Sequence, residues 1–191
     1  DTAEHIPRIF EGFTRVRRNI RFAFRTVYQY GIDFCFETGQ ETPTTILRTI
    51  NDVKARGLNN LKINLDPANL LLYGKGNPMD AVDVFGQYVV GVHVKDGDYP
   101  TDGDNLGHEH KVGTGRVNFE YIINKLHQFG YKGPLTIERE ITGDQQKKDI
   151  CQMQPLAPHS GPQTSLRFSG GSPLPGCPGR HRHRRWHQNR L

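Results

Sequence analysis

The chain has 191 residues, with 25 Lys and Arg against 20 Asp and Glu and a formal net charge of +5. This length suffices for one ordinary domain with a core, and no apolar run approaches the ~18 residues of a transmembrane helix, so we expect no membrane partner. Three cysteines at irregular spacing predict neither a disulfide framework nor a zinc site. They favour a reducing, cytoplasmic compartment.

The excess positive charge is confined to the C-terminal segment. Residues 151–191 contain six Arg, no Lys and no acidic residue, so residues 1–150 hold 19 basic and 20 acidic side chains, a net charge of −1. The high isoelectric point therefore says nothing about the surface of the remaining chain. We expect no nucleic-acid partner for that part.

Residues 1–150 alternate between helical and strand patterns. Apolar residues at helix-like intervals, flanking Pro and Gly, and short apolar runs predict the elements. In chain order these are a helix over 3–30, a strand over 32–37, a helix over 44–56, a strand over 61–66, a helix over 78–85, a strand over 88–94, a polar loop over 95–116, a helix over 119–129 and a strand over 134–140. This α(βα)₃β order is typical of a parallel sheet with covering helices.

The spacing of the strands fits a (β/α)₈ barrel, which allots roughly 31 residues to each βα unit. An open doubly wound sheet fits nearly as well. No G-x-G-x-x-G follows any strand, so the dinucleotide-binding version of that fold is not supported.

The composition changes near Ile150. Residues 151–191 hold six Pro and five Gly and have no helical or strand period, which predicts a disordered tail. Its end, "RHRHRRWH", fits a basic arm that binds nucleic acid or a His-rich tract that binds metal. The mixture of Arg, Pro, Gly, His and Ser in the whole segment is also typical of a shifted reading frame. We therefore favour a non-native tail. At the other end, the chain starts "DTAE" without Met, and we expect this to be an interior point of a longer chain.

Each predicted strand ends in a residue that can bind a metal ion. These residues are Glu37, Asp66, His93 and Glu138. Each follows an apolar residue (Phe36, Leu65, Val92 and Ile137) that we expect to face the helices, because side chains alternate across a strand. The four polar groups should therefore point to one side at the carboxyl edge of the sheet, where barrel and doubly wound enzymes keep their active sites.

A single acid after a strand is usually a cap or turn residue, and a single strand His is usually a core residue. Four such residues at matching positions indicate a metal site, because three converging carboxylates without a cation would repel one another. This mostly hard ligand set favours Mn²⁺, Mg²⁺ or Co²⁺, with Zn²⁺ as an alternative, over a closed thiolate zinc site. We expect Asp96 to accept the other ring N–H of His93.

Five stretches resemble the xylose isomerase-like TIM-barrel superfamily, which includes sugar-phosphate isomerases and epimerases and shares its architecture with the AP-endonuclease type-2 fold. They are "FETGQET", "NLDPANLLLYGKG", "GVHVKDG", "GTGRVNF" and "GYKGPLTIERE", within a resemblance that covers about residues 1–150. The resemblance implies an α/β fold in which this chain forms strands five to eight of a partial (β/α)₈ barrel. The first four strands would precede Asp1, and the closing helix would follow Ile150.

In that family the last four strands carry the metal ligands Glu, Asp, His and Glu, which fall on Glu37, Asp66, His93 and Glu138. The resemblance also implies that Glu37 and Glu138 act as acid and base, moving a proton next to a carbonyl through an enediolate stabilised by the metal ion. Substrate contacts are implied at Asn69, where epimerase relatives often have His, and at the stretch Lys95–Asp96, where they often have Arg. The identity of the sugar therefore does not carry over.

Three points stay open at this stage. Lys95 is expected either to contact the substrate, by polarising an oxygen or holding an anionic group, or to face solvent. The loop over residues 98–110 is expected to close over the pocket. We do not expect His108, Glu109 or His110 to bind the main metal ion. The alternatives to a sugar isomerase or epimerase are a metal-dependent phosphodiester hydrolase of the AP-endonuclease type and an inactive truncated barrel. A half barrel exposes two sheet edges, so self-association through them is a further expectation.

Overall fold

Four parallel strands form the central sheet, as the alternating pattern predicts. The computed structural model describes residues 27–153; the predicted helix over 3–30 lies outside this range except for its end, where residues 27–29 are helical. The strands are β1 Phe34–Glu37, β2 Leu61–Leu65, β3 Val89–Val94 and β6 Leu135–Ile137. They pair in the order β1-β2-β3-β6, and every pairing is parallel.

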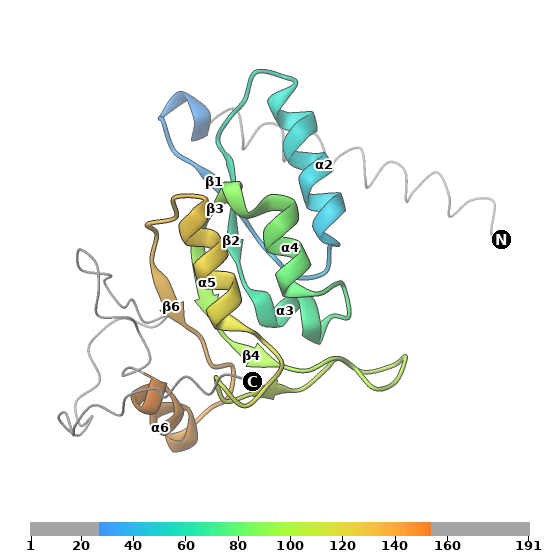
Figure 1. The fold of residues 1–191 in the computed structure, drawn as a ribbon, viewed down its shortest axis with the longest axis vertical. Helices are drawn as coiled ribbons and strands as arrows, with labels where there is room; N and C mark the ends of the chain where they lie inside the picture. The colour runs from blue at the N-terminus through green and yellow to red at the C-terminus, as the bar shows by residue number, and fades with distance from the viewer. Residues whose placement is uncertain (1–26, 154–191) are drawn as a thin grey trace, which may run out of the picture.

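Helices cover one face of this sheet. The helices of the described chain are α2 Pro43–Lys54, α3 Pro67–Leu72, α4 Pro78–Phe85 (followed by the 3₁₀ turn η1, Gly86–Tyr88), α5 Phe119–Gln128 and α6 Asp144–Met153. Helices α2, α4 and α5 pack side by side in that order, while α6 lies apart at the end of the sheet where β6 stops (Figure 1). This is the layer arrangement of one half of a (β/α)₈ barrel.

The core lies between the sheet and the three helices. It contains the fully buried strand residues Ile63, Leu65 and Val92, together with Ile50 of α2 and Phe85 of α4. Burial of one such side chain stabilises the fold by about 1.5–3 kcal/mol. The expectation that the residue before each strand-end polar group faces the helices is confirmed for Leu65 and Val92.

Local signals set the helix ends. The side-chain oxygen of Asn77 accepts the backbone N–H of Met79 at the start of α4, and that of Asn118 accepts the N–H of Tyr121 at the start of α5. Past the ends of α2 and α5, Gly57 and Gly130 both take φ of +79°, a left-handed conformation that favours glycine. These signals explain why α4 has the predicted bounds and α2 and α5 nearly so.

The structure differs from the prediction in several places. Helix α3 was not predicted, because six residues are too few to show a helical period. The predicted loop over 95–116 contains an antiparallel pair, β4 Asp96–Gly97 and β5 Glu109–His110. Strand β6 is shorter than predicted, so that Glu138 directly follows it, although its N–H still donates to Val94 at 3.2 Å.

The chain also has a helix after its last strand. Helix α6 begins before Ile150 and continues past it to Met153, so residues 151–153, which were predicted to be disordered, are helical. Ile150 packs on a small cluster formed by Val112 and Ile137. The remaining tail, 154–191, lies outside the described residues. Within the described range, no helix has both the length and the apolar character that a membrane crossing demands.

Candidate metal centre

The four strand-end residues meet at one point. Glu37 ends β1, Asp66 follows β2, His93 lies in β3 and Glu138 follows β6. One ligand atom from each of the four lies within 4.8 Å of all the others. The carboxyl edge of a parallel sheet brings these residues together, since each lies at or just past the carboxyl end of its strand.

His93 stands at the centre of this group. Its Nδ1 lies 2.5 Å from Glu138 Oε2, 3.6 Å from Glu37 Oε1 and 3.7 Å from Asp66 Oδ2. The exposed fraction of the side chain is 0% for Asp66, 17% for Glu138, 18% for His93 and 47% for Glu37. The site is thus closed on the side of β2 and open at Glu37.

The buried polar atoms at this point fit a bound cation. Asp66 Oδ2, His93 Nδ1 and Glu138 Oε2 are buried, and none of them makes an aligned hydrogen bond to another described residue. Buried polar atoms are nearly always paired, and an orphan is often the ligand of an ion. Three carboxylates and one imidazole are a mostly hard donor set, suited to Mn²⁺, Mg²⁺ or Co²⁺.

The two oxygens of Asp66 have different partners. Oδ1 accepts the backbone N–H of Asn69 at 2.9 Å and caps α3, while Oδ2 faces the cluster. Thr38 holds the backbone of the same residue, because its hydroxyl accepts from Asp66 N at 2.7 Å and donates to Asp66 O at 2.6 Å. The acid at the end of this strand therefore serves both a helix cap and the site.

Asn64 orients the imidazole of His93. Its Nδ2 lies 2.9 Å from His93 Nε2, on the ring edge opposite the cluster. Such an outer contact fixes the ring of a metal-binding histidine. Sequence reasoning assigned this role to Asp96 and missed Asn64, although Asn64 stands two residues before Asp66 and so shares its face of the sheet.

The charges of the group act on one another. Burial alone would lower the pKa of His93, but its contacts with Asp66 and Glu138 outweigh burial and raise the pKa to about 10. Burial raises the pKa of Glu37, and contact with His93 lowers that of Glu138. In the absence of a metal ion, the imidazolium takes the place of a cation among the three carboxylates.

Lys95 and Asn69, the expected substrate contacts, lie beside the cluster. The Lys95 side chain is only 1% exposed, which excludes a lysine that faces solvent, and its Nζ lies 3.7 Å from both Asp66 Oδ2 and Glu138 Oε1. Its hydrogen bonds run to Asn69 Oδ1 at 3.2 Å and to Glu140 Oε2 at 2.6 Å. Asn69 Nδ2 in turn donates to Glu37 Oε1 at 3.3 Å. Sequence reasoning did not single out Glu140.

Asp96 has a different place from the one predicted. Its carboxylate is buried, and Oδ1 accepts the N–H groups of Gly97 and Val117 while Oδ2 accepts those of Gly113 and Gly115, all at 2.8–3.0 Å. These bonds fold the loop after β3 back on itself. The structure does not bring Asp96 to the cluster or to His93, because its acceptor capacity is spent on this loop.

The polar segment after β4 stays out of the cluster as well. His110 Nε2 pairs with Asp98 Oδ2 at 2.9 Å, and Glu109 pairs with Arg139 at 2.9 Å. The side chain of His108 is 79% exposed. In the described part of the chain, the candidate metal group does not include the side chains of residues 108–110.

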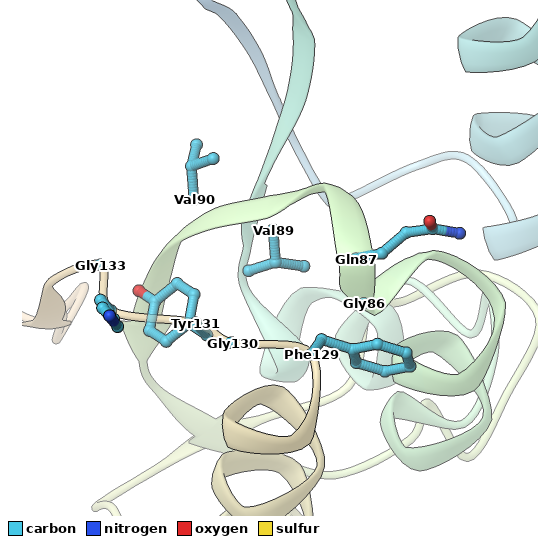
Figure 2. Close-up of a pocket in the computed structure, with 9 residues that line it drawn as sticks. Gly86, Gln87, Val89, Val90, Phe129, Gly130, Tyr131 and Gly133 are labelled. Carbon is cyan, nitrogen blue, oxygen red and sulfur yellow. The ribbon is translucent and has the colours of Figure 1, made fainter.

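A pocket lies near the first residues of β3, at the end of the strand opposite His93. Figure 2 shows side chains such as Gln87, Val90, Phe129 and Tyr131 around a space of about 310 Å³. It adjoins the first residues of β3, whereas His93 lies near the end of that strand. Because its lining contains no carboxylate and no imidazole, we place the candidate chemistry at the carboxyl edge.

Comparison with known proteins agrees with this fold. The family described as "Xylose isomerase-like TIM barrel" matches residues 2–157, and the chain belongs to this family. A solved xylose isomerase domain protein from Planctomyces limnophilus is 36% identical, with a TM-score of 0.65 over 75% of this chain and 50% of that one. The chain thus spans about half the length of this relative.

Two more distant structures share the fold. A xylose isomerase-like TIM-barrel protein from Mycobacterium smegmatis, solved in complex with magnesium, is 18% identical with a TM-score of 0.52, over 70% of this chain and 47% of that one. The 3-keto-D-glucoside 4-epimerase YcjR from E. coli is 16% identical with a TM-score of 0.53, over 71% of this chain and 51% of that one. At these identities the likeness concerns the fold alone.

Proposed function

We propose that the protein is a divalent-metal-dependent sugar isomerase or epimerase that moves a proton next to a carbonyl group. The convergence of Glu37, Asp66, His93 and Glu138 carries this proposal, because their ligand atoms lie within 4.8 Å of one another and three of those atoms are buried without an aligned partner. A sugar epimerase and a magnesium complex among the structural neighbours are consistent with it.

Glu37, Asp66, His93 and Glu138 would hold the metal ion. When bound, the ion supplies Lewis-acid stabilisation of negative charge on substrate oxygens. Asn64 keeps the ring of His93 turned so that Nδ1 faces the site, and Asp66 stays fixed because its other oxygen caps α3. The ligand set is therefore largely preorganised by the sheet.

Glu37 and Glu138 are the proposed acid and base. They stand on the outermost strands of the described sheet, β1 and β6, so they flank the space above β2 and β3 from opposite sides. One carboxylate removes the proton from the substrate carbon, and the other returns a proton at the neighbouring carbon or on the opposite face. Acid–base groups placed in this way contribute roughly 10²–10⁴-fold to the rate.

Calorimetric titration with Mn²⁺ tests the metal site in this chain. We expect one ion per chain in the wild type, and a loss of at least about tenfold in affinity in Glu37→Gln and in Glu138→Gln. Glu120→Gln, an exposed position on α5, is the matched control and should bind as the wild type does. Equal affinity in all four proteins would remove the proposal.

The chain spans about half the length of the relative it matches, so the activity is proposed for a protein with a complete barrel. Ketose–aldose interconversion or epimerisation by such a longer protein, abolished by Glu138→Gln, is the expected result. Activity that survives this substitution would assign the proton transfer to another residue.

A further inference from the structure

The lysine at the site is neutralised from within the protein. Lys95 is 1% exposed and has four oxygens around its Nζ, of which Glu140 Oε2 is the nearest at 2.6 Å. We propose that the site selects an uncharged sugar over a phosphorylated or carboxylated one, with the Lys95–Glu140 pair as the determinant. This inference rests on the proposed function and names the charge class of its substrate.

Lys95 has little capacity left for a substrate anion. An ammonium group has three N–H donors, and two of them are used by Glu140 and Asn69. The remaining side of Nζ faces the carboxylates of Asp66 and Glu138, both at 3.7 Å. A phosphate group would have to displace the Glu140 carboxylate or the Asn69 amide from Nζ, or approach Nζ beside the carboxylates of Asp66 and Glu138, which would repel it.

Glu140 is held in place over Lys95. Its side chain is 61% exposed, so burial does not fix it. Its backbone N–H, however, donates to both carboxylate oxygens of Glu109, at 3.1 and 3.0 Å. Glu109 pairs with Arg139 at 2.9 Å, and Arg139 pairs with Asp149 of α6 at 3.0 Å. Two further elements of the chain, β5 and α6, thereby secure the segment that carries Glu140.

The balance of charge disfavours a second anion. The carboxylates of Glu37, Asp66, Glu138 and Glu140 exceed the combined charge of Lys95 and a divalent cation by one negative charge. Among the described residues, Lys95 and the ligand candidate His93 are the basic side chains within ion-pair distance of the three candidate carboxylates. Repulsion between these carboxylates and an anion selects against anionic ligands, while a neutral polyol meets no such penalty.

The test compares two ligands that differ by a phosphate. Mn²⁺ binding to the full chain is measured first by calorimetry, because it reports on the metal site alone. Fructose and fructose 6-phosphate are then titrated into the Mn²⁺-loaded chain at low ionic strength, where electrostatic effects are largest. We expect fructose to bind at least about fivefold more tightly than its phosphate ester.

Glu140→Gln identifies the determinant. It removes one negative charge and frees Lys95, so at saturating Mn²⁺ the ratio of the two affinities should shift towards the phosphate ester by about five- to tenfold. Asp52→Asn removes the same charge from an exposed position near the end of α2 and should leave the ratio as it is.

Each result decides the matter. Tighter binding of fructose 6-phosphate by the wild type, or an affinity ratio that Glu140→Gln does not shift, overturns the inference. Mn²⁺ binding without binding of either sugar also overturns it and leaves the metal site standing. A chain that binds no Mn²⁺ overturns the proposed function together with the inference.

Discussion

Asp66 performs two tasks that substitution can separate. Its Oδ1 caps α3 through the N–H of Asn69 at 2.9 Å, and its buried Oδ2 faces the candidate metal centre. Asp66→Asn retains a carbonyl oxygen for the cap and replaces the facing carboxylate by a neutral amide. Asp66→Ala removes both groups.

The two substitutions should therefore have different consequences for stability. Loss of a helix cap costs about 1 kcal/mol, which corresponds to a fall in Tm of about 2–4 °C in a chain of this size. We expect this fall in metal-free Asp66→Ala relative to Asp66→Asn. For metal binding the two should agree, with a loss in Mn²⁺ affinity of at least about 100-fold, because loss of a direct ligand costs at least as much as loss of an outer one.

Differential scanning calorimetry and Mn²⁺ titration measure the two effects on the same samples. The control is Asn118→Ala, which removes the equivalent cap of α5, made to the N–H of Tyr121 at 3.0 Å. It should lower Tm by a similar amount and leave Mn²⁺ affinity unchanged. If Asp66→Asn binds Mn²⁺ as tightly as the wild type, Asp66 is a cap alone and the four-ligand centre is wrong.

Four further outcomes are expected. Arg139→Met leaves the largely buried carboxylates of Glu109 and Asp149 without their ion-pair partner and should destabilise the fold by about 3–5 kcal/mol. Denaturant unfolding measures this loss, and hydrogen exchange should show reduced protection of α6; unchanged protection would contradict the prediction. Burial would raise the pKa of Asp149, but the hydrogen bonds of its carboxylate to Arg139 and Gln145 lower this pKa below the usual 3.8. Asp149 therefore stabilises α6 at neutral pH, and this stabilisation is lost as pH falls through the lowered pKa. The pH dependence of amide hydrogen exchange in α6 measures the loss. Gly91→Ala would place a Cβ 2.6 Å from Oδ1 of Asn64, which orients His93, so Mn²⁺ affinity should fall by about 10–100-fold. Wild-type affinity in this variant would show that Asn64 does not orient the ring. Because β1 and β6 each lack a strand partner on one edge among the described residues, the chain should self-associate in analytical ultracentrifugation, and a monomer at every concentration would exclude this.

The sheet and its ligand set were predictable because they depend on short-range pattern. Alternation along β2 buries Leu61, Ile63 and Leu65 and leaves the next residue, Asp66, at the strand end, so the position of the acid follows from the sequence. Parallel strands then place their carboxyl ends at a common edge. This is why the convergence of the four candidate ligands could be expected before any coordinates.

The partners of these ligands could not be predicted in the same way. Asn64 reaches His93 because the pairing of β2 with β3 shifts register between Ile63 and Asn64, and no local pattern reveals that shift. Asp96 was expected near His93 because the two are close in sequence, yet the loop returns over its carboxylate and supplies four backbone N–H groups.

The amino-acid sequence by itself determined which four side chains gather at the sheet edge, since the strand period is a local property and the alternation of strands with helices implies a parallel sheet. Only the tertiary structure decided what surrounds them: Glu140 over Lys95, Asn69 between Lys95 and Glu37, and α6 joined through Arg139. These contacts depend on how loops return and which of several nearby polar groups each side chain meets, and such choices are settled by packing across the whole fold rather than by spacing along the chain.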